Sequence, residues 1–373
     1  ITGSGKTEVY LQIAAHELTR SRHCLILTPE IGLVPQLVDR FSKRFGSNVF
    51  EYHSNCTPKE RIETWRISLE TTTPSIFIGT RSAIFLPLSN LGLIVIDEEH
   101  DSSYKQESPM PCYNARDLAI NRAKKVGAKV ILGTATPSLN VWKNLKPKGK
   151  INVAKLTRRI LNRKLPLVNV VDMRTELADG NRSLISRYLK KELSNLKQNG
   201  NQAIILVPRR GYSSFLSCRS CGEVVQCPHC DVTLTVHRSK EGNQWLRCHW
   251  CDFRSKISNK CGGCGSNAFK PFGTGTQRVM DHLERDLEGI KLLRFDRDTT
   301  RGRDGHRLLL KRFADGDADI LVGTQMLSKG MDLPKVTLAV VLAADGLLHR
   351  PDLMATEETL QLFMQLAGRA GRG

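Results

Sequence analysis

The sequence predicts an α/β protein of two doubly wound lobes, with a cysteine-rich zinc-binding insertion in the second lobe. Short apolar runs rich in β-branched residues alternate with longer helical stretches, a pattern typical of parallel sheets covered by helices on both faces. Four Cys-x-x-Cys pairs interrupt this pattern, and this spacing is typical of zinc ligands. We expect lobe 1 at residues 1–148, lobe 2 at 149–214 and 272–373, and the insertion at 215–271.

The composition favours a polyanionic partner. The 373 residues include 56 Lys and Arg but only 37 Asp and Glu, which gives a formal net charge of +19. Such an excess favours nucleic acid first and an anionic membrane surface second. No apolar run approaches the roughly 18 residues that span a bilayer, so we expect no membrane segment. The chain begins with Ile1 rather than Met and stops at Gly373, and we expect it to be a fragment.

Lobe 1 is organised around a strand expected at Leu93–Ile96, which Asp97, Glu98, Glu99 and His100 follow. Successive apolar residues suit a strand that is buried on both faces. The acids then emerge at the carboxyl end of the strand, where open α/β sheets bind ligands. There one carboxylate can hold a magnesium-bound phosphate while the other polarises an attacking water. A solvated acidic loop is the alternative for this cluster taken alone.

A phosphate loop is expected at the start of the chain, where Gly3–Thr7 matches the second half of the G-x-x-x-x-G-K-[ST] motif. Glycines let backbone N–H groups approach phosphate oxygens, Lys6 reaches the β and γ phosphates, and Thr7 offers a hydroxyl to Mg²⁺. Joined to the acids after the buried strand, this half-motif predicts a nucleoside triphosphatase.

Three further strands of lobe 1 end in small hydroxyl-bearing clusters. Exposed N–H groups and hydroxyls at strand ends are suited to gripping a nucleic-acid backbone without reading bases. Each cluster alone is most often a helix N-cap, and their recurrence on one sheet edge favours binding. The expected strands and clusters are Cys24–Leu27 with Thr28–Glu30, Ser75–Ile78 with Gly79–Ser82, and Val130–Gly133 with Thr134–Pro137.

Lobe 2 is expected to hold four strands of the same kind. The segment from Pro147 to Ser183 is dense in Lys, Arg and Asn, and we interpret it as the crossing between the lobes. The expected strands are Gln202–Val207, Ile290–Leu293, Ile320–Val322 and Val336–Leu342, and polar groups follow at Arg209–Gly211, Asp296–Asp298 and Gly323–Gln325. Two lobes facing each other across a cleft is the expected architecture.

The sequence ends in an arginine motif, Gln365 to Arg372. Arg369 and Arg372 are three residues apart, so they lie on one face of a helix, and the glycines between them permit close approach. If that face closes on the phosphate loop, one arginine can stabilise charge on the transferred γ-phosphoryl group. A solvated basic helix end is the alternative.

Eight of the 11 cysteines form four pairs, enough for two tetrahedral Cys₄ zinc sites. The interval between the second and third pairs fits C-x₂-C-x₁₅₋₂₀-C-x₂-C, which favours a nested arrangement. One ion would then be held by Cys227, Cys230, Cys248 and Cys251, and the other by Cys218, Cys221, Cys261 and Cys264. His229, His237 and His249 are expected not to be ligands, and Cys24, Cys56 and Cys112 are interpreted as plain thiols.

The order of these motifs resembles the helicase core of the PriA family, superfamily 2 DNA helicases that restart stalled replication forks. The residues that carry the resemblance are Gly3–Thr7, Thr28–Leu33, Gly79–Ser82, Asp97–Gln106, Thr134–Pro137, the eight paired cysteines, Gly323–Gly330 and Gln365–Arg372. The resemblance implies two RecA-like lobes, ATP-driven 3′ to 5′ translocation on DNA, and two structural zinc ions that help dock partner proteins. It also implies a bacterial cytoplasmic protein whose partners are forked and single-stranded DNA, primosome proteins, single-stranded DNA-binding protein and the machinery that loads the replicative helicase.

The resemblance also implies DNA contacts, because in this family an aromatic-rich loop after the Asp-Glu-x-His box couples DNA contact to hydrolysis. Stacking of a base on an aromatic ring is worth about 1 to 3 kcal/mol, and tyrosines that pack in the core are the alternative. The expected DNA contacts are Thr80, Arg81, Tyr104, Lys105, Tyr113, Arg116 and Thr324. The family often has His where this chain has Asn114, so no role is assigned there. The family's amino-terminal DNA-binding regions and carboxyl-terminal domain are absent from this sequence, so we expect a nearly whole motor.

The leading hypothesis is therefore an enzyme, a DNA-stimulated ATPase that unwinds duplex DNA, remodels stalled forks and helps load the replicative helicase. Asp97 would support Mg²⁺, and Glu98 would activate water. The expected nucleotide-binding residues are Gly3, Ser4, Gly5, Lys6, Thr7, Asp97 and Gln365, and the expected catalytic residues are Lys6, Glu98, Arg369 and Arg372. One alternative is a zinc-stapled DNA scaffold with a vestigial ATPase, which the intact motif residues argue against. Another superfamily 2 motor would not account for the cysteine insertion.

Overall fold

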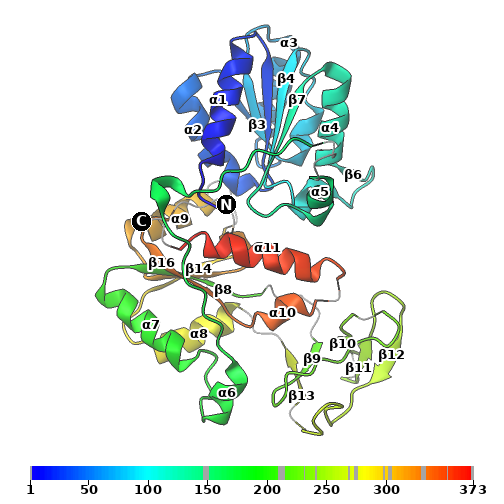
Figure 1. The fold of residues 1–373 in the computed structure, drawn as a ribbon, viewed down its shortest axis with the longest axis vertical. Helices are drawn as coiled ribbons and strands as arrows, with labels where there is room; N and C mark the ends of the chain where they lie inside the picture. The colour runs from blue at the N-terminus through cyan, green and yellow to red at the C-terminus, as the bar shows by residue number, and fades with distance from the viewer. Residues whose placement is uncertain are drawn as a thin grey trace. The chain divides into compact units, whose positions relative to one another are not determined.

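The chain forms two compact units, lobe 1 (Ile1–Lys164) and lobe 2 (Leu165–Gly373), in the computed structural model (Figure 1). The structure describes residues 2–145, 151–208, 215–230, 232–239, 242–267, 269–272, 276–296, 299–300, 305–328, 333–350 and 352–370. Within these ranges, no helix combines the length and the apolar content that crossing a membrane requires.

Lobe 1 ends later than the predicted division after residue 148. The Ile160 N–H donates a hydrogen bond to Gly3 O at 3.0 Å, and Arg159 is buried. The segment that the sequence assigned to the crossing therefore returns to the phosphate loop before the chain leaves lobe 1. Because this hydrogen bond joins backbone atoms, no pattern of side chains in the sequence could have predicted it.

The sheet of lobe 1 has five parallel strands in the order β2-β3-β1-β4-β7. The strands are β1 (His23–Leu27), β2 (Val49–Tyr52), β3 (Ile76–Gly79), β4 (Leu91–Asp97) and β7 (Lys129–Gly133). The four predicted strands of this lobe are confirmed, with small shifts at their ends. The edge strand β2 was not predicted, because its residues are only partly buried and form no apolar run.

Helices cover both faces of this sheet, as the doubly wound prediction requires. Along β4, Leu93 and Val95 pack with α1 (Lys6–Leu18) and α2 (Val34–Phe45), whereas Ile94 and Ile96 pack with α4 (Ala115–Val126). The alternation follows from the two-residue period of a strand. The other elements of the lobe are α3 (Pro58–Glu70), α5 (Leu139–Asn144), η1 (Ile31–Leu33), η2 (Arg81–Phe85), η3 (Ser102–Tyr104), η4 (Ile160–Asn162), and the hairpin of β5 (Lys105–Gln106) and β6 (Tyr113–Asn114).

Lobe 2 contains a four-stranded parallel sheet in the order β14-β15-β8-β16. Its core is also divided between two faces: Ile205 packs with α7 and α8, and Ile204 packs with α9 and α11. The strands are β8 (Gln202–Leu206), β14 (Leu292–Phe295), β15 (Ile320–Gly323) and β16 (Val336–Val341). The helices are α6 (Met173–Ala178), α7 (Arg187–Gln198), α8 (Thr276–Asp286), α9 (Gly305–Asp315), α10 (Asp345–Leu348) and α11 (Ala355–Ala367), with the short η5 (Gln325–Ser328).

The cysteine-rich insertion of lobe 2 forms a separate antiparallel sheet in the order β12-β11-β10-β9-β13. Its strands are β9 (Phe215–Cys218), β10 (Thr235–Arg238), β11 (Gln244–Arg247), β12 (Arg254–Lys256) and β13 (Phe269–Phe272). Its small apolar core includes Leu216, Leu234 and Leu246 together with the buried Cys227 and Cys248. The predicted fold class, two α/β lobes with an insertion in the second, is confirmed.

Candidate functional site

The phosphate loop turns directly into helix α1. Gly3 and Gly5 have φ angles of 71° and 87°, in the left-handed region that favours glycine. Gly5 is the N-cap of α1, so the first N–H groups of the helix lie at the loop and can receive an anion. The Ser4 hydroxyl is buried and has no hydrogen-bond partner among the described residues. An unpaired donor in such a loop fits a phosphate oxygen.

Lys6 joins the phosphate loop to the acidic box. It stands in the first turn of α1, and its Nζ lies 2.7 Å from Glu98 Oε1 and 3.9 Å from Asp97 Oδ1. All three side chains are about one-fifth exposed. The two carboxylates stabilise the ammonium group in this partly dry site, and its partial exposure leaves it accessible to an incoming phosphate.

Asp97 is held by a residue that the sequence analysis did not single out. The Tyr10 hydroxyl donates to Asp97 Oδ1 at 2.8 Å, and burial raises the pKa of Tyr10 well above its ordinary value, which keeps it a donor. Burial raises the pKa of Asp97 as well, against the opposing effect of the Lys6 charge. Gly133 leaves the room that Tyr10 needs, since a Cβ there would lie 1.6 Å from the Tyr10 hydroxyl. The available signal was the position of Tyr10, one helical turn after Lys6.

Glu98 turns toward Lys6 through a backbone conformation that is rare for its residue type, with φ at 49°. Such conformations cost free energy and cluster at functional sites. His100 Nδ1 lies 3.8 Å from Glu98 Oε2 and 2.9 Å from Thr134 Oγ1. The predicted hydroxyl cluster after β7 is therefore linked to the acidic box by His100. Burial lowers the pKa of His100, which favours the neutral ring.

Glu99 is a second residue that the sequence analysis left without a role. Its side chain is buried, and its two oxygens accept hydrogen bonds from the Ser138 N–H at 2.8 Å, the Ser138 hydroxyl at 3.2 Å and Arg116 at 3.2 Å. A buried carboxylate needs such partners because it has lost its water. Arg116 is an ion-pair partner of Glu99, its side chain is 15% exposed, and its expected contact with DNA stays a prediction.

The expected DNA contact of Tyr104 is wrong in this structure. Its side chain is 1% exposed, and its hydroxyl donates to Leu27 O at 3.0 Å and Asp97 O at 2.6 Å. No face of the ring is open for a base to stack on. Tyr104 ties the carboxyl ends of β1 and β4 together, so the packing alternative holds for this residue.

The other expected DNA contacts of lobe 1 lie nearer the surface. Lys105 is exposed and pairs with Glu107 at 2.9 Å. Tyr113 is partly buried and meets Phe85 edge-on, with ring centroids 5.0 Å apart. Arg81 donates to Lys105 O at 3.1 Å, which ties the β5–β6 hairpin to the end of β3, where Thr80 precedes η2. Their contact with DNA stays a prediction.

In lobe 2, the predicted site residues lie at the ends of strands and helices. Gln365 is buried in α11, Arg369 follows that helix, and Thr324 is buried after β15. Asp296 is buried at the end of β14. Other residues named in the sequence analysis lie outside the described residues: Arg209, Arg210, Gly211, Arg297, Asp298, Gly330 and Arg372.

The eight paired cysteines form two groups of four, Cys218, Cys221, Cys261 and Cys264, and Cys227, Cys230, Cys248 and Cys251. Sulfur atoms lie 3.7 Å apart for Cys218 and Cys264 and 3.6 Å apart for Cys227 and Cys251. A zinc ion with Zn–S bonds of ~2.3 Å in a tetrahedron requires sulfur atoms about 3.8 Å apart. The donor sets therefore fit two structural zinc ions, in the nested grouping that the spacing favoured.

Tight turns hold these cysteine pairs in place. The Gly222 N–H donates to Cys218 O and the Gly265 N–H donates to Cys261 O, each at 2.9 Å. Both glycines have positive φ angles, 84° and 71°. His237 and His249 belong to neither group of four, and their Nε2 atoms lie 3.2 Å apart.

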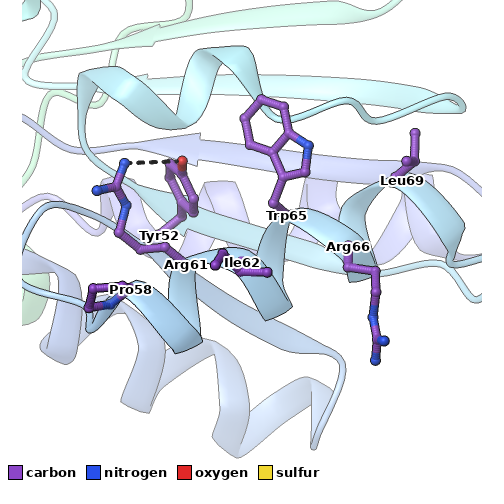
Figure 2. A pocket seen from close by; sticks show the side chains of 7 residues that line it. All are labelled: Tyr52, Pro58, Arg61, Ile62, Trp65, Arg66 and Leu69. Carbon is purple, nitrogen blue, oxygen red and sulfur yellow. Dashed lines mark hydrogen bonds between the residues drawn. The ribbon is translucent and has the colours of Figure 1, made fainter.

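A hollow of about 500 Å³ on the outer side of α3 lies apart from all of these residues (Figure 2). The Arg61 guanidinium donates to the Tyr52 hydroxyl at 3.5 Å and lies over its ring. The lining residues are Tyr52, Pro58, Arg61, Ile62, Trp65, Arg66 and Leu69. None of them is a predicted nucleotide, zinc or DNA contact, so the hollow is not the predicted active site.

Three protein families match separate parts of the chain. Residues 1–145 match the DEAD/DEAH box helicase family, and residues 270–373 match the helicase conserved C-terminal domain. Residues 227–256 match the PriA DNA helicase Cys-rich region domain. The third match includes one complete group of four cysteines.

Relatives match the chain along its whole length. It is 48% identical over 377 residues to the replication restart protein PriA of Synechocystis sp. and 46% identical over 372 residues to that of Bacillus subtilis. Over its whole length the chain is therefore similar to PriA proteins. It covers 45% and 46% of these two PriA proteins, so it spans about half the length of the relatives it matches.

Solved structures also resemble this chain in fold. RecG bound to a three-way DNA junction is 17% identical with a TM-score of 0.52, and the match covers 100% of this chain and 37% of RecG. The helicase MrfA bound to DNA and AMPPNP is 14% identical with a TM-score of 0.54, covering 100% of this chain and 43% of MrfA. Identities this low show a shared helicase-core fold alone.

Proposed function

We propose that the chain is the motor of an ATP-dependent DNA helicase that moves 3′ to 5′ and remodels stalled replication forks. The observation that carries the proposal is the position of Lys6, whose ammonium group lies between Asp97 and Glu98 at the mouth of a glycine loop. These are the groups that phosphoryl transfer to water requires: a phosphate cradle, a cation, a metal ligand and a base. Whole-length similarity to replication restart proteins supports the role at forks.

In this proposal the nucleotide lies at Gly3–Thr7. Backbone N–H groups and the unpaired Ser4 hydroxyl bind phosphate oxygens, and Lys6 exchanges its carboxylate partners for the β and γ phosphates. Thr7 and Asp97 would hold Mg²⁺, which neutralises charge on the phosphates when bound. Glu98, released from Lys6, would orient the attacking water and accept its proton.

Lobe 2 completes the site in this proposal. Gln365, Arg369 and Arg372 would meet the same nucleotide as Lys6, and closing of the lobes around it would move a strand of DNA. An arginine that stabilises the transferred phosphoryl group contributes roughly 10³ to 10⁵ in rate.

DNA and the replication machinery are the proposed partners. The excess of 56 basic over 37 acidic residues supports binding to the phosphate backbone. We propose forked and single-stranded DNA, contacted by Thr80, Arg81, Lys105, Tyr113 and Thr324. The proposed protein partners are primosome proteins, single-stranded DNA-binding protein and the machinery that loads the replicative helicase, and the proposed location is the bacterial cytoplasm.

The proposal is tested by measuring ATP hydrolysis by the full-length protein with and without forked DNA. We expect forked DNA to stimulate hydrolysis and Lys6→Ala to abolish it. Lys43→Ala is the matched control, because Lys43 is an exposed lysine of α2. A wild-type protein that binds forked DNA without DNA-stimulated hydrolysis would instead support the scaffold hypothesis.

A further inference from the structure

A third cluster of metal-binding side chains lies outside the zinc insertion, at the carboxyl end of β2. Glu51, His53 and Cys56 each offer one ligand atom, and these atoms lie within 4.8 Å of one another. The Cys56 sulfur lies 3.4 Å from His53 Nδ1 and 3.7 Å from His53 Nε2, and His53 Nε2 lies 3.6 Å from Glu51 Oε2. No residue of the cluster belongs to the phosphate loop, the acidic box or the cysteine groups.

The backbone brings these three side chains to one place. Glu51 lies in β2, and His53 lies in the bend that directly follows Tyr52, the last residue of this strand. The Cys56 N–H donates to His53 O at 3.2 Å, which closes the turn and returns the thiol to the imidazole. The following residue, Thr57, caps α3 with a complete capping box. A paired strand on one side and a capped helix on the other therefore fix the turn.

The distances suit a tetrahedral metal ion. Zinc bonds of ~2.3 Å to sulfur and ~2.0 to 2.2 Å to nitrogen or oxygen place neighbouring ligand atoms roughly 3.3 to 3.6 Å apart. The observed separations of 3.7 and 3.6 Å are close to this range. His53 and Cys56 are buried, at 7% and 6% exposed, whereas the Glu51 side chain is 39% exposed and leaves a path for an ion.

The charges also favour a cation. A thiol and a carboxylate flank a single imidazole, and both become anionic ligands when a metal binds.

We propose that Glu51, His53 and Cys56 bind a third zinc ion, separate from the two groups of four cysteines. Sulfur, nitrogen and oxygen donors together are typical of zinc, and three protein ligands leave one coordination position open. The turn lies beside the end of β3, because Tyr52 pairs with Gly79 in the sheet. A zinc ion there would stiffen the backbone next to Thr80 and Arg81.

Zinc content of the intact protein tests this proposal. We expect elemental analysis to give three zinc ions per chain in the wild type and two in Cys56→Ser. Cys112→Ser is the matched control, because Cys112 is an exposed thiol outside every cluster, and it should retain three. Wild-type protein stripped of weakly bound metal should rebind one equivalent of Zn²⁺ in calorimetry, and Cys56→Ser should not.

A second variant, Glu51→Gln, keeps the test valid if Cys56→Ser fails to fold. Glu51→Gln changes a partly exposed side chain and should keep the wild-type unfolding curve while weakening binding of the third ion at least tenfold. Two zinc ions per chain in the wild type, with no added binding on titration, would overturn the proposal. Three ions in the wild type and in both cluster variants would also overturn it, since the third ion would then lie elsewhere.

Discussion

Lys6 donates a hydrogen bond to Glu98 at 2.7 Å, across 92 positions of the sequence. Lys6, which we propose binds phosphate, is thus paired with Glu98, which we propose activates water. Since one ammonium group cannot fully neutralise both Glu98 and a phosphate group, we expect nucleotide binding to draw Lys6 away and to free Glu98. The pair would then keep the base occupied until phosphate arrives.

The role of Glu98 predicts a separation of binding from turnover. In Glu98→Gln the amide oxygen can still accept a hydrogen bond from Lys6, so the loop should keep its shape and bind ATP. Loss of a general base typically costs about 10² to 10⁴ in rate, and the ATP hydrolysis rate should fall by that order. Glu107→Gln, an exposed neighbour beyond the acidic box, is the control. Normal turnover in Glu98→Gln would remove this residue from its proposed role.

The buried position of Tyr104 predicts an effect on stability. Tyr104→Phe removes a hydroxyl that donates to the carbonyl oxygens of Leu27 and Asp97 and leaves both with one partner fewer. A typical intramolecular hydrogen bond contributes about 0.5 to 1.5 kcal/mol, so the free energy of unfolding of lobe 1 should fall by about that amount in urea titrations. Tyr113→Phe, on a partly exposed ring, should change it less. Equal effects of the two variants would contradict the buried position of Tyr104.

The sequence was most informative where one side-chain pattern has one physical solution. The β-branched apolar run Leu93–Ile96 favoured a strand covered on both faces, and the structure places it at the centre of β4. The cysteine spacing likewise favoured the nested grouping, because the interval from Cys230 to Cys248 fits a single zinc site, and the structure gives this grouping. Strand β2 has no such run, since it lies at the sheet edge and three of its four residues are only partly buried, and it was missed.

Roles decided by burial could not be read from the sequence. A tyrosine after an acidic box can stack on a base or close a core, and the residues nearby are the same in both cases. Only the packing of Tyr104 between β1 and β4 decides this. The role of Glu99 could not be predicted either, because its hydrogen-bond partner Ser138 lies 39 residues away in the sequence. The role of Tyr10 could not be predicted for the same reason, because its hydrogen-bond partner Asp97 lies 87 positions away in the sequence.

The nested cysteine grouping predicts which double variants lose one zinc ion and which lose two. Cys218 and Cys261 belong to one group, so Cys218→Ser with Cys261→Ser should release a single ion. Cys218 and Cys227 belong to different groups, so Cys218→Ser with Cys227→Ser should release two. Both pairs remove two thiolates, which makes each the control for the other. Elemental analysis of purified protein gives the count, and the reverse result would show that the pairs are grouped differently.

His23 predicts a pH dependence of stability that is separate from the active site. The ring is buried in β1, and its Nδ1 accepts a hydrogen bond from the Ser75 N–H at 3.2 Å. Burial lowers the pKa of His23 below its ordinary value. His23 in the unfolded chain, with a pKa near 6.5, therefore binds a proton at a higher pH than His23 in the folded chain. The contribution of the neutral His23 ring to the free energy of unfolding is therefore fully present above about pH 6.5. It is lost as the pH falls toward the pKa of His23 in the folded chain.

We expect His23→Asn to flatten this dependence, because the asparagine oxygen can accept the Ser75 hydrogen bond and does not titrate. The measurement is the free energy of unfolding of lobe 1 at pH 7.5 and pH 5.5 in both proteins. The wild type should lose more stability than the variant on acidification, by up to about 1.4 kcal/mol for each pH unit in which the two states differ by one proton. Other titrating groups contribute equally to both proteins and cancel in the difference. Parallel losses in the two proteins would mean that His23 accepts a proton without leaving its buried position.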